Sequence, residues 1–178
     1  IGDGSGAGVN GTTSIGNTNT VDLNFNGTLY SFDGGTTTIT AKSGDNIDMG
    51  AGADTTFTTA ADNITFATAN IELLNGSNLT VDTGATGGNI TIGAIAGTSV
   101  ETVTLDAGTG SLSVGVIGSG TEIGAVTLGS TDDGTITLNG AITADAAVTI
   151  TGPVTLATGA ISVTTTNDNI TFNDTIDG

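Results

Sequence analysis

The chain has 178 residues, 1 of them basic and 18 acidic, so its formal net charge is −17. This charge repels nucleic-acid phosphates and anionic membrane surfaces, so we expect neither as a partner. The chain has no Cys, which excludes disulfides and thiol chemistry. Aromatic residues make up 3% of it, which disfavours a sandwich core built on large rings. No apolar run is long enough to span a bilayer, so no membrane insertion is expected.

The pattern divides the chain into two parts. Residues 1–20 are dense in Gly, Asn, Ser and Thr and show no sustained alternation, which predicts an irregular segment or a flexible linker. From residue 21 to residue 178, strand signals recur roughly every eight to twelve residues. No segment shows a 3.6-residue apolar period, so helices are not expected.

A tripeptide unit, apolar–Thr–apolar, recurs along the second part. Four copies begin at Val103, Val126, Val148 and Ile170, at nearly constant intervals of about 22 residues. Weaker copies continue toward the N-terminus at less regular intervals: Leu79–Val81, Phe57–Thr58, Ile39–Thr40 and Val21–Leu23. Repetition at this period indicates stacked units rather than one globular core.

Side chains alternate between the two faces of a strand, so the outer two residues of each unit point inward and the central Thr points outward. The chain is therefore predicted to be all-β, a parallel β-helix (β-solenoid) of about seven or eight coils, with about 18–24 residues in each coil. An antiparallel β-sandwich is the alternative, but it does not require similar tripeptides at nearly constant intervals.

Two further faces are predicted from other strand-like segments. The second face comprises Leu112–Val114, Ile136–Leu138 and Val154–Leu156. The third comprises Ile123, Ile142–Thr143 and Ile161–Val163. Three short faces in each coil, joined by tight turns, give a triangular cross-section.

The segment from Glu101 to Gly178 resembles the β-helical repeats of filamentous haemagglutinin-type adhesins, which are exported by two-partner secretion. The likeness is carried by VTLDAGTGSLSVGVIGSGTEIGAVTLGSTDDGTITLNGAIT and AVTITGPVTLATGAISVTTTNDNITFNDTIDG. The resemblance implies a surface rod, fibre or adhesin stalk. The sequence begins at Ile1 without a signal-like segment, so we interpret it as a piece of a secreted, cell-surface precursor.

Candidate metal ligands occur in one segment. Asp45, Asp48 and Asp54 lie among glycines in a pattern similar to the nonapeptide of calcium-binding β-rolls, and hard oxygen ligands on tight turns suit Ca²⁺. The alternative is an ordinary turn role for each aspartate, with no ion. No other cofactor is predicted.

Carboxylates are the only groups left for catalysis, because the chain has no His and one Lys. Asp132–Asp133 is the only adjacent acidic pair, and a glycosidase needs two carboxyls across a cleft. We interpret the pair as a solvated turn and the protein as non-enzymatic, with a polysaccharide-acting enzyme as the least favoured alternative. The outward threonines suggest another alternative, an ice-binding face, although such a face usually presents two Thr per strand and Thr is common in strands anyway.

An open stack of coils exposes strand edges at its ends. We therefore expect head-to-tail self-association into a filament, in which residues near 165–178 pair with the first coil of a following unit. A donated strand from residues 1–20 is the second mode considered. A host or surface glycan is the other partner considered.

Overall fold

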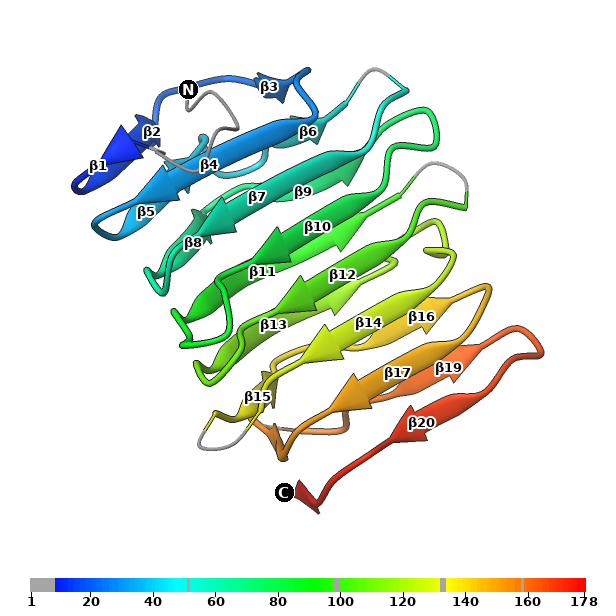
Figure 1. Ribbon diagram of the computed structural model, residues 1–178. Coiled ribbons are helices and arrows are strands. Elements are labelled where there is room, and N and C mark those ends of the chain that lie inside the picture. The colour runs from blue at the N-terminus through cyan, green and yellow to red at the C-terminus, as the bar shows by residue number, and fades with distance from the viewer. Residues whose placement is uncertain (1–8, 51, 98–99, 132–133, 158) are drawn as a thin grey trace.

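The computed structural model describes residues 9–50, 52–97, 100–131, 134–157 and 159–178. Within these ranges the chain contains strands and turns and no helix, and every strand pairing is parallel. The strands stack into a β-solenoid of seven coils, and the first two faces continue into an eighth (Figure 1). The predicted fold class is confirmed, and the antiparallel sandwich is excluded. In the part of the chain that the structure describes, no helix is long and apolar enough to cross a membrane.

Three faces make up each coil. The first face consists of β1 (Val9–Asn10), β4 (Leu29–Asp33), β7 (Thr55–Thr59), β10 (Leu79–Asp82), β12 (Val103–Asp106), β14 (Val126–Gly129), β17 (Val148–Thr151) and β20 (Ile170–Phe172). The second consists of β2 (Thr13–Gly16), β5 (Thr37–Thr40), β8 (Ile64–Ala67), β15 (Ile136–Leu138), β18 (Val154–Leu156) and β21 (Ile176–Asp177). The third consists of β3 (Leu23–Phe25), β6 (Asn46–Met49), β9 (Asn70–Leu73), β16 (Ile142–Ala144) and β19 (Val163–Thr165).

Two long strands join the second and third faces. β11 (Ile90–Ala96) pairs with β8 on the second face and with β9 on the third. β13 (Leu112–Ile117) pairs with β15 and β16 in the same way. The two faces therefore form one continuous sheet in the middle of the solenoid, opposite the first face.

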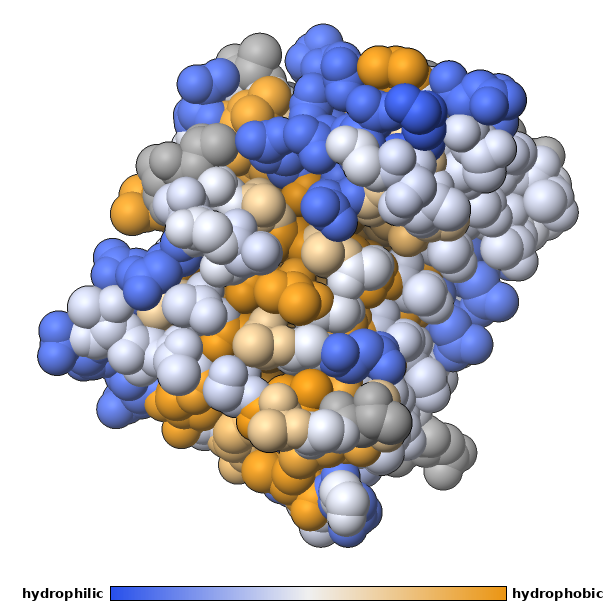
Figure 2. Space-filling model, turned by 180° about the vertical axis from the view of Figure 1, so that it is seen from behind, coloured by the Kyte–Doolittle hydropathy of each residue, from blue (hydrophilic) through white to orange (hydrophobic). Residues whose placement is uncertain are grey.

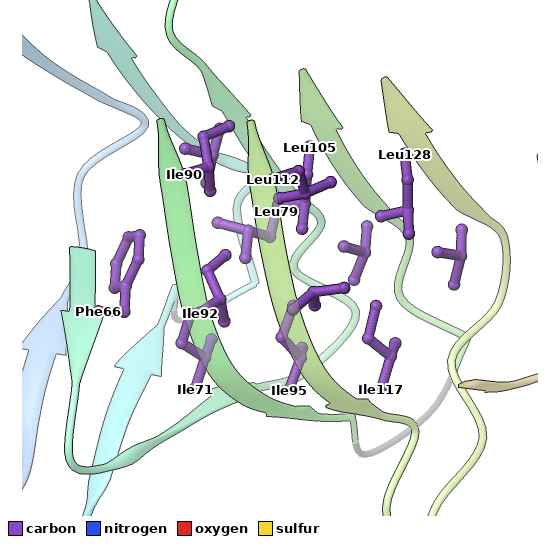
Figure 3. Close-up of a cluster of buried hydrophobic side chains, with 14 of the residues drawn as sticks. Phe66, Ile71, Leu79, Ile90, Ile92, Ile95, Leu105, Leu112, Ile117 and Leu128 are labelled. Carbon is purple, nitrogen blue, oxygen red and sulfur yellow. The ribbon is translucent and has the colours of Figure 1, made fainter. Parts of the chain in front are cut away.

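The predicted lumen is confirmed in the C-terminal half. Val103, Val126 and Val148 are in register on adjacent strands and fully buried, and Leu105, Leu128 and Ile150 form the next buried column. Figure 3 shows such side chains from facing sheets packed together between the layers. The threonines between these columns point outward. In the eighth coil Ile170 is 40% exposed, because no described coil covers it.

Of the predicted N-terminal units, Leu79–Val81 follows the main column, whereas Ile39–Thr40 and Val21–Leu23 do not. Ile39 lies on β5 of the second face and Leu23 on β3 of the third, so the assignment of both to the first face is wrong. β4 occupies that place on the first face, where its Leu29 is in register with Thr56 of β7. The second-face prediction is confirmed, whereas on the third face Ile142 pairs with Val163 rather than with Ile161.

The first coil begins earlier than the pattern predicted. β1 and β2 both lie within residues 1–20, and β2 pairs with β5 along its whole length, so residues 13–16 belong to the solenoid rather than to a linker. The residues that fill the lumen near these strands explain why the repeat pattern is weak in the N-terminal sequence. Aromatic rings fill the lumen in this half, and the rings of Phe25, Tyr30 and Phe57 have centroids 4.9–5.1 Å apart, where later coils stack aliphatic side chains.

Candidate functional site

The three predicted calcium ligands do not converge. The Asp45 carboxylate accepts a hydrogen bond from Lys42 Nζ at 3.0 Å, in an ion pair on the surface. Asp54 Oδ1 accepts hydrogen bonds from the backbone N–H and the side-chain amide of Asn78, at 3.1 and 2.8 Å. Asp48 points outward from the middle of β6. Among the described residues, no group of three or more His, Cys, Asp or Glu side chains is arranged to hold a metal ion.

Asp48 belongs to an acidic and amide column on the third face. It lies in register between Asn24 on β3 and Glu72 on β9. Asn46 donates its side-chain amide to the Glu72 carboxylate. Partial burial raises the pKa of Asp48 above its usual value, and the charges of Glu72 and Asp22 raise it further. This column is a local concentration of negative charge.

Two acidic side chains border a hollow of the described surface. Asp132–Asp133, the pair singled out from the sequence, lies outside the described residues. Glu122 and Asp145 line an open hollow of about 560 Å³, but both side chains are exposed to solvent. A general acid of a glycosidase is usually shielded so that it stays protonated. Exposed carboxylates in an open hollow do not provide that environment.

One buried carboxylate escaped the sequence analysis. Glu101 is fully buried just before β12, and its Oε1 accepts a hydrogen bond from the backbone N–H of Gly76 at 3.1 Å. Its backbone carbonyl accepts from the N–H of Gly124 at 2.7 Å. Glu101 therefore ties three successive coils together at one corner. A single Glu in a polar segment gives no sequence signal of burial, so pattern reasoning could not find it.

The first face carries an uninterrupted run of outward threonines from β7 to β20. Cα partners in register place six of them on consecutive coils: Thr56, Thr80, Thr104, Thr127, Thr149 and Thr171. The neighbouring outward column is mixed and includes Asp82 and Asp106. These carboxylates accept hydrogen bonds from the N–H groups of Gly84 and Gly108, at 2.7 and 2.9 Å, and so fix the turns that follow the strands. The face thus presents one regular hydroxyl column.

The second face carries a similar column beside a groove. The column consists of five threonines and two serines in register: Ser14, Thr38, Thr65, Thr91, Ser113, Thr137 and Thr155. The groove has a volume of about 460 Å³ and crosses β8, β11 and β13. Figure 2 shows this side of the molecule, where hydrophobic surface runs down the middle between polar residues. None of the described residues that line this groove carries a charged side chain.

The architecture defines the class of protein as a parallel β-solenoid. Comparisons with known protein families, with curated proteins and with solved structures find no match to this chain. The structure shows the β-helical architecture expected from the adhesin-like repeats. The family to which the chain belongs is a proposal.

Proposed function

We propose that the chain is part of a secreted, non-enzymatic structural protein of the cell surface, a β-solenoid rod of the filamentous haemagglutinin-like kind that forms a fibre, sheath or adhesin stalk. The observation that carries the proposal is the unbroken lumen. From Phe57 to Ile150 each inward position on the first face meets its counterpart one coil on, so the stack has no natural stopping point within it. Such a stack of coils suits a long rod rather than a site that encloses a substrate.

Features of the last coil support extension of the rod. Val148 N–H donates to Asn169 O, and Asn173 N–H donates to Ile150 O, at 3.0 and 2.9 Å. The alternation of a parallel ladder then directs the N–H groups of Ile170 and Phe172 to the other edge of β20. Ile170 on β20 is 40% exposed and Ile176 on β21 is 49% exposed. A further coil of the same kind would cover both the apolar side chains and the strand edge.

The charge of the rod favours end-to-end over side-to-side contact. A net charge of −17 spread over the sides repels parallel neighbours, whereas pairing at the ends gains main-chain hydrogen bonds and apolar burial. A translation along the coil axis generates an open filament rather than a closed oligomer. The following coil is then supplied by a second copy or by the continuation of a longer polypeptide.

Sedimentation velocity of the purified chain tests this proposal. We expect association that increases with protein concentration and that is abolished by the double substitution Ile170→Asp and Ile176→Asp, which places unpaired charges at the junction. Thr127→Asp, on the side of the rod, is the matched control and should leave association unchanged. A monodisperse monomer at all concentrations for the unmodified chain would contradict the self-association.

Ice binding is the second candidate, and the six in-register threonines of the first face are the observation that favours it. The charged Asp82 and Asp106 in the neighbouring column weigh against a flat ice-matching array. Thermal hysteresis of the purified chain separates the ice-binding function from the structural one. Hysteresis that is lost in Thr104→Leu would support ice binding. No hysteresis in the unmodified chain would leave the structural rod as the proposed function.

A further inference from the structure

An outward column of the second face lacks large side chains over three successive coils. Thr40 pairs with Ala67. On the following coils Ala67, Gly93, Gly115 and Asn139 each come one residue after an aligned column, which consists of Phe66, Ile92, Val114 and Leu138. Ala67, Gly93 and Gly115 are the small members, and the larger Thr40 and Asn139 lie on either side of them. Ala67, Gly93, Gly115 and Asn139 line a groove of about 460 Å³.

The groove has a polar side and an apolar floor. Thr65, Thr91 and Ser113 border it with one hydroxyl per coil, which by strand spacing repeats every ~4.8 Å. Asn139 borders it at one end and donates its side-chain amide to Ser113 Oγ at 3.0 Å. The floor consists of the Gly93 and Gly115 backbone above the nearly buried Phe66 and Ile92.

We propose that this groove binds an extended, neutral oligosaccharide that lies along the solenoid axis. Sugar rings present hydroxyls at their edges and C–H groups on their faces, so the hydroxyl column can hydrogen-bond the edges while the apolar floor contacts the faces. Among the described residues that line the groove, none carries a charged side chain. The net charge of −17 excludes acidic polysaccharides and also disfavours a second copy of the chain as the occupant.

This inference deepens the proposed function, since it assigns a ligand to the surface rod. It rests on the proposed function in one respect, the extracellular location in which the groove would meet glycans. One hydroxyl per coil allows contacts to repeat as a chain follows the axis, so affinity should increase with oligosaccharide length. In the described lining of the groove no aromatic side chain is exposed to stack on a sugar, so we expect weak binding by each sugar unit.

Saturation-transfer NMR with cellohexaose, mannohexaose and chitohexaose, each mixed with the whole chain, tests the proposal. At least one of the three should bind, and a galacturonic acid hexamer should not. Gly93→Val should abolish binding, because a Cβ at Gly93 has no atom within 4 Å and its side chain would fill the groove without disturbing the fold. Thr91→Val should weaken binding about tenfold by loss of one hydroxyl, and Thr91→Ser should restore it.

Two controls make failure informative. Thr127→Val alters the hydroxyl column of the opposite face and should bind like the unmodified chain. Sedimentation of Gly93→Val should match that of the unmodified chain, so loss of sugar binding and loss of assembly are separated. The glycan proposal is overturned if none of the three neutral hexasaccharides binds, if Gly93→Val still binds, if the acidic hexamer binds equally well, or if Gly93→Val changes self-association instead.

Discussion

Asp48 on β6 lies directly opposite Glu72 on β9, with both carboxylates on the outer side of the third face. Like charges in register on adjacent strands destabilise a sheet. Burial, Glu72 and Asp22, in that order, raise the pKa of Asp48. The folded chain therefore holds a proton on Asp48 at pH values where the unfolded chain has lost it, and stability falls as pH rises through the window above 3.8.

We predict that Asp48→Asn increases the free energy of unfolding at pH 7 by roughly 0.2–1 kcal/mol and has little effect at pH 3. Urea unfolding of both proteins at the two pH values measures the difference. Asp168→Asn, at an exposed turn position, is the control and should change neither. A loss of stability in Asp48→Asn at pH 7 would show instead that a cation or a hydrogen-bond donor depends on this carboxylate.

Two threonines in the lumen provide a second prediction. The hydroxyls of Thr37 and Thr55 are buried without a hydrogen-bond partner among the described residues, in columns that Ile64 and Leu79 continue. Thr55→Val replaces the hydroxyl by a methyl of the same shape and should stabilise the chain by about 1–3 kcal/mol. The outward Thr56→Val should have an effect close to zero. Equal melting temperatures for Thr55→Val and the unmodified chain would contradict the absence of a partner.

The aliphatic columns predict a large difference between adjacent residues. Leu128 is fully buried and stacks between Leu105 and Ile150, so Leu128→Ala should cost about 2–5 kcal/mol of unfolding free energy. Thr127 beside it is exposed, and Thr127→Ala should stay within about 0.5 kcal/mol. Similar losses for the two substitutions in chemical unfolding would be incompatible with the inward and outward assignment.

Two glycines in the floor of the groove should differ in their response to substitution by Ala. A Cβ at Gly115 would lie 1.5 Å from the carbonyl oxygen of Gly93, so β11 and β13 would have to separate. Gly115→Ala should therefore destabilise the chain by at least about 1–3 kcal/mol. Gly93→Ala meets no atom within 4 Å and should be nearly neutral. Thermal unfolding of the pair decides the matter, and a neutral Gly115→Ala would contradict the close approach of the two strands.

The sequence predicted the C-terminal coils well because their signal is redundant. From Val103 to Ile150, nearly constant intervals, apolar flanks and a central Thr all specify one register. In the N-terminal coils the interval between β4 and β7 is longer than that between any later pair of first-face strands, and Tyr30 and Phe32 replace the aliphatic unit. Ile39 then offered a better match to the pattern than the true first-face strand did.

The candidate site was less accessible to sequence reasoning. The groove depends on Gly93 and Gly115 being aligned on adjacent strands, which no local pattern around either glycine reveals. The aspartate-rich segment, in contrast, matched a local motif, yet its side chains have separate partners: Lys42 for Asp45 and Asn78 for Asp54. Both the groove and the partners of these aspartates depend on the register between coils. That register is set by turn lengths and lumen packing rather than by residues close in sequence.

Electron diffraction or cryo-electron microscopy of the concentrated chain tests the central claim, that the coils form a rod that extends through its last coil. We predict filaments with strands perpendicular to the long axis and an axial repeat of ~4.8 Å that continues across the junctions between copies. The Ile170→Asp and Ile176→Asp double variant should give only short, separate particles. Compact closed oligomers, or filaments with strands parallel to the long axis, would contradict the account.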